Sequence, residues 1–349
     1  MNVEFFLGAN SGNGFYSLYD NFCRGDGDFL HLIKGGPGGG KSGFMRRIGA
    51  AAEDKGYDVE YILCSGDPDS LDGVYIPDLK VGYADATAPH IMEPTRFSFD
   101  SDYVNLGEFC RRSDNTDISE YFRLYKEMYA CAYSYLSAAA NIKKADNFEL
   151  FDTDTAKKIK SRVQNLVKLC MGKQASPSGN ADISRRFISC ISCRGKITNQ
   201  STINKLCKHV CLMDDKLGQA HIFLKEAADA ALASGQKLIL CPDPLMPERL
   251  EAVLLPNNST AFVSGSIMPY DKPWRHIRID AMADTDILHF RREEIKCSKK
   301  LYTSAMDMAV YYLTRAKYYH DLLENQYKPN MDFDGLNKFT YEEINRLFK

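Results

Sequence analysis

The chain has 349 residues, about twice the commonest domain size, so its length predicts two domains. Hydrophobic residues make up 44% and charged residues 26% of the sequence, which is typical of a globular protein and excludes a largely disordered chain. The net charge of -2 gives no electrostatic footprint for nucleic acid or an anionic membrane, and no apolar run approaches the roughly 20 residues that span a bilayer.

The first residues and the cysteines together favour a cytoplasmic protein. The opening segment lacks the basic region of a signal peptide. The 11 cysteines are an odd number scattered along the chain, a pattern typical of reduced thiols. Residues 8–14 are rich in glycine and form either a plain turn or a loop that folds over a ligand. A protein partner or a homo-oligomer is compatible with this composition.

The first clear elements are an apolar strand at residues 29–34 and a helix that begins near Lys41. The segment between them satisfies the phosphate-loop pattern G-x-x-x-x-G-K-[S/T]. Glycines let the backbone close around a phosphate, and the start of the helix adds the positive end of its dipole. The predicted nucleotide-binding residues are Gly35, Gly36, Pro37, Gly38, Gly39, Gly40, Lys41, Ser42 and Gly43.

This loop predicts a site for a nucleoside triphosphate with Mg²⁺. Lys41 supplies a point charge to the β- and γ-phosphates, and the Ser42 hydroxyl ligates the metal. The Asn-Lys-x-Asp motif that reads guanine does not occur in the sequence, so ATP is favoured over GTP.

Candidate metal and catalytic residues follow the next predicted strands. Asp85 ends the segment 79–84, where a carboxylate at a strand's carboxyl end holds Mg²⁺ directly or through water, although a turn-forming role is the alternative. Asp67 is the other candidate metal ligand. His90 either orients an attacking water or contacts the γ-phosphate, or is an ordinary packed histidine. The predicted catalytic residues are Lys41, Asp85 and His90, and the predicted metal ligands are Ser42, Asp85 and Asp67.

Helical spacing and a linker divide the rest of the chain. Apolar residues recur at helical spacing in 119–144 and again in 299–327. The segment 173–184 is rich in Ser, Pro, Gly and Asn and is typical of a linker. We predict a P-loop NTPase domain at 1–172, this linker, and a second domain with C-terminal helices at 185–349.

A degenerate repeat with a period of about 180 residues relates the two halves. The strand at 29–34 recurs at 208–214, and the segment 71–77 recurs at 250–256. The second half has an acidic, glycine-poor segment at 215–222 in place of the phosphate loop, so we expect one nucleotide site per chain. The expected fold is α/β, with two tandem P-loop-NTPase-like lobes, mostly parallel sheets and appended helices, the second lobe having a degenerate loop.

The repeat also helps to separate structural from catalytic polar residues. A lobe that binds no phosphate should keep the residues that stabilise the fold and lose the residues that take part in catalysis. Asp67-Pro68 matches Asp243-Pro244, which predicts a structural turn. Asp85 matches Gly265, and His90 matches Tyr270. Asp85 therefore varies with the phosphate loop and is the favoured metal ligand.

Several segments resemble a bacterial family of tandem P-loop ATP-binding proteins. They are Gly8–Asp20, the phosphate loop, residues 67–74, the segment Asp85-Ala86-Thr87-Ala88-Pro89-His90 and residues 104–108. The resemblance covers nearly the whole chain and implies a two-lobed P-loop NTPase that binds ATP. In that family the second lobe often has its own phosphate loop, which this chain lacks. No substrate carries over from the resemblance.

The leading functional interpretation is an ATPase whose Mg²⁺-dependent hydrolysis drives a movement between the lobes or controls a partner. The first alternative is a small-molecule or nucleotide kinase, in which Asp67 or Asp69 accepts the acceptor's proton under a helical lid. The second is a nucleotide-gated binding module with little turnover.

Overall fold

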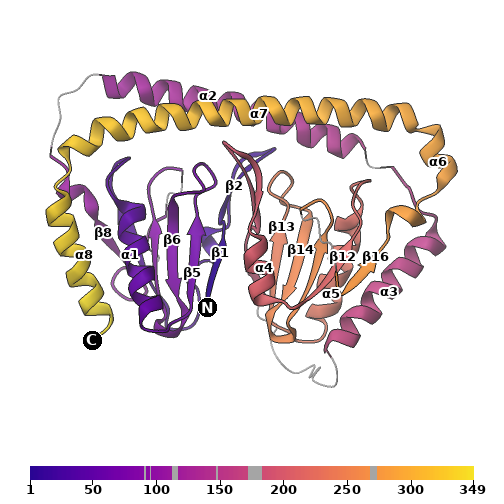
Figure 1. Ribbon diagram of the computed structural model, residues 1–349, viewed down its shortest axis with the longest axis horizontal. Coiled ribbons are helices and arrows are strands. Elements are labelled where there is room, and N and C mark those ends of the chain that lie inside the picture. The colour runs from indigo at the N-terminus through magenta and orange to yellow at the C-terminus, as the bar shows by residue number, and fades with distance from the viewer. Residues whose placement is uncertain (90–91, 95, 112–116, 147, 172–182, 268–272) are drawn as a thin grey trace.

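The computed structural model describes the chain apart from residues 90–91, 95, 112–116, 147, 172–182 and 268–272. Two six-stranded sheets stand side by side, and two long helices lie across one end of both (Figure 1). The architecture is α/β with mostly parallel sheets, which confirms that part of the predicted fold class.

The first sheet has the strand order β1-β5-β6-β7-β4-β8. Strand β6 runs opposite to the others, because it pairs antiparallel with both β5 and β7, whereas the remaining pairings are parallel. The central strands are apolar over most of their length, as expected for strands covered on both faces. The strands are β1 Asn2–Phe5, β4 Phe29–Lys34, β5 Val59–Leu63, β6 Leu71–Ile76, β7 Val81–Asp85 and β8 Ser101–Asn105.

The second sheet repeats this arrangement, with the order β9-β13-β14-β15-β12-β16 when read from the matching edge. Here β14 is the reversed strand. Its strands are β9 Ile183–Arg185, β12 His209–Met213, β13 Leu238–Pro242, β14 Leu250–Leu255, β15 Thr260–Ser264 and β16 Arg275–Ile277. Each half adds a hairpin, formed by β2 Gly8–Ser11 with β3 Gly14–Ser17 and by β10 Ser189–Ser192 with β11 Gly195–Thr198.

Strand pairing corrects one equivalence between the halves. Ile33 of β4 pairs with Asp85 of β7, and the corresponding pair in the second sheet is Met213 of β12 with Ser264 of β15. Asp85 therefore corresponds to Ser264, and the match with Gly265 is wrong by one residue.

The match of Asp67-Pro68 with Asp243-Pro244 is also wrong. In the turn before β6, the Ser70 N–H donates to the Asp67 carbonyl at 2.8 Å. In the turn before β14, the Arg249 N–H donates to the Met246 carbonyl at 2.9 Å. Because both turns lead directly into equivalent strands, Asp67 corresponds to Met246. The second half has therefore lost this carboxylate, and the repeat gives no reason to regard it as structural.

One helix packs on each sheet within its own half. These helices are α1, Lys41–Asp54, and α5, Ala220–Leu232. The α1 helix buries Phe44, Ile48 and Ala52, which lie on one face because three and four residues make about one helical turn. The shorter helices are α4 Gln200–Leu206 and α6 Thr285–Phe290.

The remaining helices are exchanged between the halves. Helix α2, Asp117–Ala145, and helix α7, Arg292–Tyr327, run antiparallel across both sheets (Figure 1). Helix α3, Thr153–Met171, then packs on α5 of the second half, and α8, Phe333–Leu347, packs on α1 of the first. Helices α3 and α8 thus each cover the sheet of the other half. Residues 183 and 184 of the predicted linker begin strand β9, and the rest of that linker lies outside the described residues.

The N-terminal parts of the two halves form the joint between the lobes. Phe6 and Phe187 exchange two backbone hydrogen bonds of 2.9 Å, and one apolar core contains residues of both halves. The hairpin that holds residues 8–14 belongs to this joint, since the Asn10 side chain donates to the Ile191 carbonyl at 2.8 Å. It is therefore a connection between lobes and not a cover over a ligand.

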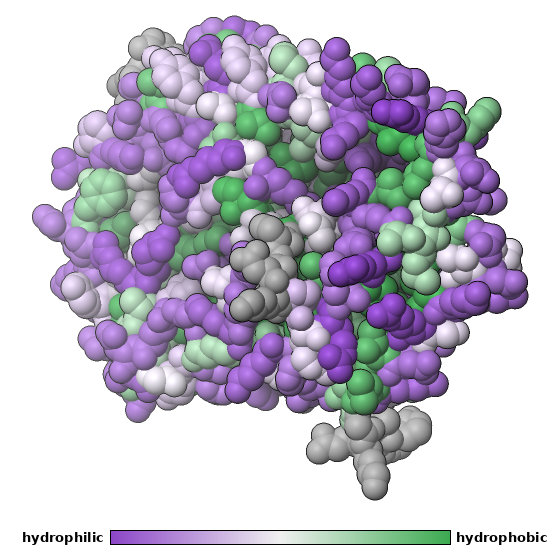
Figure 2. Space-filling model, turned by 45° about the vertical axis from the view of Figure 1, so that its right-hand side comes forward, coloured by the Kyte–Doolittle hydropathy of each residue, from purple (hydrophilic) through white to green (hydrophobic). Residues whose placement is uncertain are grey.

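The long helix α7 has one buried face, and the outer surface of the molecule is mostly hydrophilic. Helix α7 buries Ala305, Ala309, Leu313, Ala316 and Leu323 along one stripe. On the face in Figure 2, hydrophilic side chains cover most of the surface, and hydrophobic ones lie in recesses between them. Among the described residues, no helix combines the length and the apolar character needed to cross a membrane.

Candidate functional site

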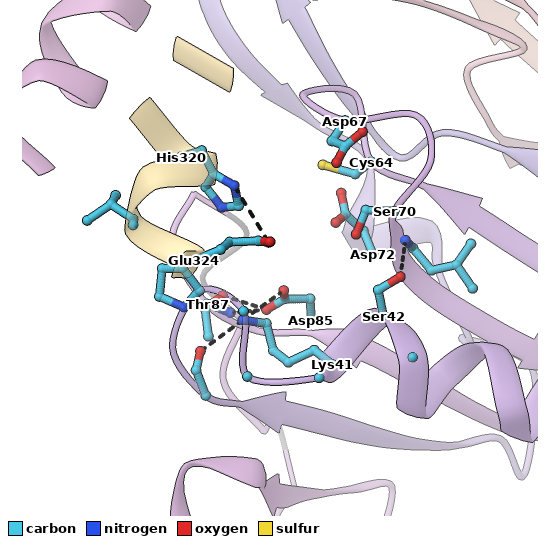
Figure 3. Close-up of a pocket in the computed structure, with 18 of the residues that line it drawn as sticks. Lys41, Ser42, Cys64, Asp67, Ser70, Asp72, Asp85, Thr87, His320 and Glu324 are labelled. Atoms are coloured by element: carbon cyan, nitrogen blue, oxygen red, sulfur yellow. Dashed lines mark hydrogen bonds and ion pairs between the residues drawn. The ribbon is translucent and has the colours of Figure 1, made fainter. Parts of the chain in front are cut away.

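A cavity of about 520 Å³ lies at the carboxyl edge of the first sheet, directly over the phosphate loop. The loop forms its floor, and residues of β6, β7, α2 and α7 surround it (Figure 3). All the predicted loop residues except Gly36 line this cavity. The structure therefore brings the predicted nucleotide-binding residues to one place.

The backbone of the loop depends on glycine at two positions. Gly38 and Gly40 have φ angles of 65° and 80°, in the left-handed region that other residues rarely adopt. Gly40 is also the N-cap of α1 and supplies no side-chain cap to the helix. The first turn of α1 thus presents the positive end of the helix dipole to the cavity, which favours an anion there.

Lys41 is held between the loop and a carboxylate. Its Nζ donates to the carbonyl oxygens of Gly35 at 2.9 Å and Gly36 at 3.0 Å, and lies 3.5 Å from Asp85 Oδ2. The side chains of Lys41 and Asp85 are each only 12% exposed. Their charges are therefore poorly screened by water and act strongly on any group that enters the cavity.

Asp85 and Ser42 provide oxygen atoms of the kind that Mg²⁺ prefers. Asp85 Oδ1 accepts hydrogen bonds from the Thr87 N–H at 2.9 Å and the Thr87 hydroxyl at 2.6 Å, which fixes the orientation of the carboxylate. Ser42 Oγ accepts from the Leu71 N–H at 2.9 Å and retains a second lone pair. In the described part of the chain, no group of three or more His, Cys, Asp or Glu residues could hold a metal. A cation here would accordingly need phosphate oxygens besides Ser42 and Asp85.

Two further carboxylates line the wall that faces α7. Asp67 Oδ2 lies 3.4 Å from Lys317 Nζ of α7, so its charge helps to hold that helix in place. Asp72 is 5% exposed and corresponds to Glu251 of the second lobe, an acid kept in both halves. Asp69, by contrast, pairs with Arg194 and does not line the cavity.

Sequence reasoning missed the residues that roof the cavity from α2 and α7. His320 and Glu324 lie across the cavity from Asp67 and Asp72 (Figure 3). His320 Nδ1 is 3.8 Å from Glu324 Oε1, and its ring lies 5.7 Å from that of Tyr125 on α2. Burial lowers the pKa of His320 and raises the pKa of Tyr125 to about 12, which favours the neutral form of both at pH 7.

Close packing between the roof and the loop explains further glycines. A Cβ on Gly36 would lie 3.0 Å from the Tyr327 ring, and one on Gly38 would lie 3.0 Å from the Glu324 carbonyl oxygen. A Cβ on Gly40 would come within 2.5 Å of Leu336 on α8. The many glycines of the loop therefore indicated that another element packs closely against the loop, as well as a phosphate site. The sequence could not show that this element is α7.

One predicted site residue, His90, cannot be compared between the two halves. His90 and its match Tyr270 lie outside the described residues, whereas the nearby Thr87 and Pro89 line the cavity. In the second half, Asp215 Oδ1 accepts from the Ala220 N–H at 2.9 Å at the start of α5. The Asp215 carboxylate thus already binds a backbone N–H group at the start of α5, where a phosphate would otherwise bind. This agrees with the expectation that residues 215–222 do not cradle a phosphate.

Comparisons of the chain with models of protein families, with curated proteins and with solved structures find no match. The resemblance to tandem P-loop ATP-binding proteins stays a prediction. The function is therefore inferred from the cavity itself.

Proposed function

We propose that the chain is an ATP-binding P-loop NTPase that hydrolyses ATP with Mg²⁺ in the cavity of the first lobe. The observation that carries this proposal is the 3.5 Å approach of Lys41 to Asp85, at the start of α1 and at the end of two adjacent parallel strands. P-loop NTPases use this combination of a loop lysine and a strand-end carboxylate. The matching sheet topologies support two P-loop-like lobes, of which the second lacks the loop.

Each residue of the floor has a distinct task in this proposal. The loop from Gly35 to Gly43 would surround the triphosphate, with Lys41 neutralising the β- and γ-phosphates. Ser42 and Asp85 would hold Mg²⁺, which when bound offsets the negative charge that develops on the transferred phosphoryl group. A cavity of about 520 Å³ lies within the usual range for ligands of this size.

The contact between the two lobes bears on where a nucleotide-driven movement would take place. One apolar core spans both lobes, so a movement of the whole lobes would expose buried side chains. Helix α7 instead rests directly on the loop through Glu324 and Tyr327 and extends over the second lobe. We therefore place the movement in the part of α7 that contacts the loop, around Glu324 and Tyr327, where a partner protein would detect it.

The decisive experiment uses Lys41→Ala, which removes the only side-chain cation of the loop. Mg-ATP should raise the melting temperature of the parent but not of this variant, while both have the same far-UV circular dichroism. Lys55→Ala, at the exposed end of the same helix, is the control and should respond like the parent. Equal thermal shifts for Lys41→Ala and the parent would refute the nucleotide site.

A cavity covered by helices α2 and α7 is also compatible with a kinase and with a nucleotide-binding module. A kinase would use Asp67, which lines the cavity, and would turn over ATP only when its acceptor is added. A binding module would bind Mg-ATP tightly and release almost no phosphate. A phosphate-release assay with and without a metabolite panel separates both from an ATPase, which consumes ATP without an acceptor.

A further inference from the structure

A second cavity, of about 190 Å³, lies in the second lobe at the position that matches the nucleotide cavity. Its lining comes from the same parts of the fold, namely the loop before α5, the turn before β14, and helices α2 and α7. The correspondence extends to single contacts. His320 of α7 lies against Tyr125 of α2 in the first cavity, and Lys143 of α2 lies over Tyr302 of α7, 4.8 Å from its ring centre, in the second.

The charge of this second cavity differs sharply from that of the first. Four cationic side chains line it, and they come from four separate segments. They are Lys143 of α2, Lys216 of the loop, Arg249 of the turn and Lys299 of α7. Asp146 is the carboxylate among the lining residues, and it accepts a hydrogen bond from the Ser298 hydroxyl at 2.7 Å.

Among the described residues, none of these four cations forms an ion pair, and Lys143 contacts the Tyr302 ring instead. Four like charges around a small cavity repel one another, and an anion bound between them would relieve that repulsion.

The loop itself does not provide the anion site. Asp215 already caps the start of α5, so the helix end is satisfied by the protein's own carboxylate. The binding groups are therefore side chains, from α2, α7, the turn and Lys216 of the loop, and not the backbone N–H groups that a phosphate loop uses. Its volume is less than half that of the first cavity, too small for a nucleotide but sufficient for a compact ligand.

We infer that this cavity binds a small phosphoryl anion with at least two negative charges, without a nucleoside. Arg249 supplies the planar fork that suits two phosphate oxygens, and the three lysines supply point charges. The inference is independent of ATP binding, because it uses none of the residues of the first cavity.

Inorganic pyrophosphate without Mg²⁺ is a direct probe, measured by calorimetry on the full chain carrying Lys41→Ala so that the phosphate loop does not contribute. One binding event per chain is expected. Lys143→Met with Arg249→Met should weaken it by at least about tenfold. The matched control is Lys157→Met with Lys158→Met on the exposed side of α3, which removes the same charge and should leave the affinity unchanged.

Absence of pyrophosphate binding would overturn the inference, as would an equal loss in both double variants, since the latter would show only a general charge effect. Thermal melting checks that the variants fold. If the Lys143 and Arg249 double variant is unfolded, Lys299→Met at the exposed rim replaces it and should lower the affinity in the same direction. In a chain that keeps Lys41, Mg-ATP should raise the melting temperature equally with and without the Lys143 and Arg249 substitutions. The experiment therefore tests the pyrophosphate site and the ATP site independently.

Discussion

Asp85 and Asp67 both line the nucleotide cavity, but they have different partners. Asp85 lies beside Lys41 and has its second oxygen fixed by Thr87, whereas Asp67 faces Lys317 of the roof. Asp85→Asn should therefore keep nucleotide binding and lose Mg²⁺-dependent turnover by roughly a hundredfold or more, since the proposed metal ligand is removed. Binding calorimetry and phosphate release on the same variant measure the two effects.

Asp67→Asn should instead loosen the roof. The side chains of Asp67 and Lys317 are each 27% exposed, so we expect a loss of about 0.5 to 1 kcal/mol in unfolding free energy and turnover within a factor of about three of the parent. Lys317→Met also removes the ion pair of Lys317 with Asp321, so its loss of unfolding free energy should be at least as large as that of Asp67→Asn. Loss of turnover in Asp67→Asn together with an active Asp85→Asn would assign the metal to Asp67.

The pKa of His320 predicts how stability depends on pH. Burial places its pKa in the folded chain below the value of about 6.5 in the unfolded chain, so the folded chain binds fewer protons. Its contribution to stability is complete above about pH 6.5 and is lost as the pH falls towards the folded pKa. The charged groups that act on it are Glu324, Lys317, Asp321 and Lys41.

His320→Gln should consequently lose less unfolding free energy than the parent between about pH 7.5 and about pH 5.5. Urea denaturation at both pH values measures the difference. His289→Gln, at an exposed position on α6, is the control and should follow the parent. An identical pH dependence in His320→Gln and the parent would contradict the burial of a neutral imidazole.

At the scale of elements, the contact between the phosphate loop and α7 can be tested with two glycines. Gly38→Ala adds a Cβ at positive φ and 3.0 Å from the Glu324 carbonyl, so it should destabilise the fold by about 1 to 3 kcal/mol. Gly43→Ala lies in the first turns of α1 with no atom within 4 Å of the added Cβ, and should stabilise the fold by up to about 1 kcal/mol. Urea denaturation of both variants should show effects of opposite sign, and an unchanged or raised stability of Gly38→Ala would count against the close packing.

Local chemistry made the strand, the loop and the helix at residues 29–54 predictable, because apolar spacing and glycines act over short distances. Equivalences between the halves were harder to predict. A common pair such as Asp-Pro recurs near the right place by chance, whereas the true register depends on hydrogen bonds between strands. That is why Asp67 was matched to Asp243 instead of Met246. Helical spacing likewise identified 299–327 as a helix without indicating which sheet it covers, so His320 was missed.

For the whole molecule, the two cavities predict how many nucleotides bind. Only the first has a glycine loop with a helix start free of a side-chain cap, while Asp215 caps the second and the space there is about 190 Å³. Calorimetry with Mg-ATP should give one site per chain, lost in Lys41→Ala. Two equivalent ATP sites would show that the second lobe binds nucleotide in another way.

The exchange of helices also affects the order in which the protein can be made. Synthesis produces the phosphate loop early, but the residues that roof it, His320 and Glu324, and the α8 helix that covers α1 are added some 280 residues later. While the second half is being translated on the ribosome, the side of α1 that α8 covers in the folded chain stays exposed to solvent. The cavity over the phosphate loop therefore cannot be complete until α7 and α8 have left the exit tunnel, so a truncated product should lack the proposed ATP binding.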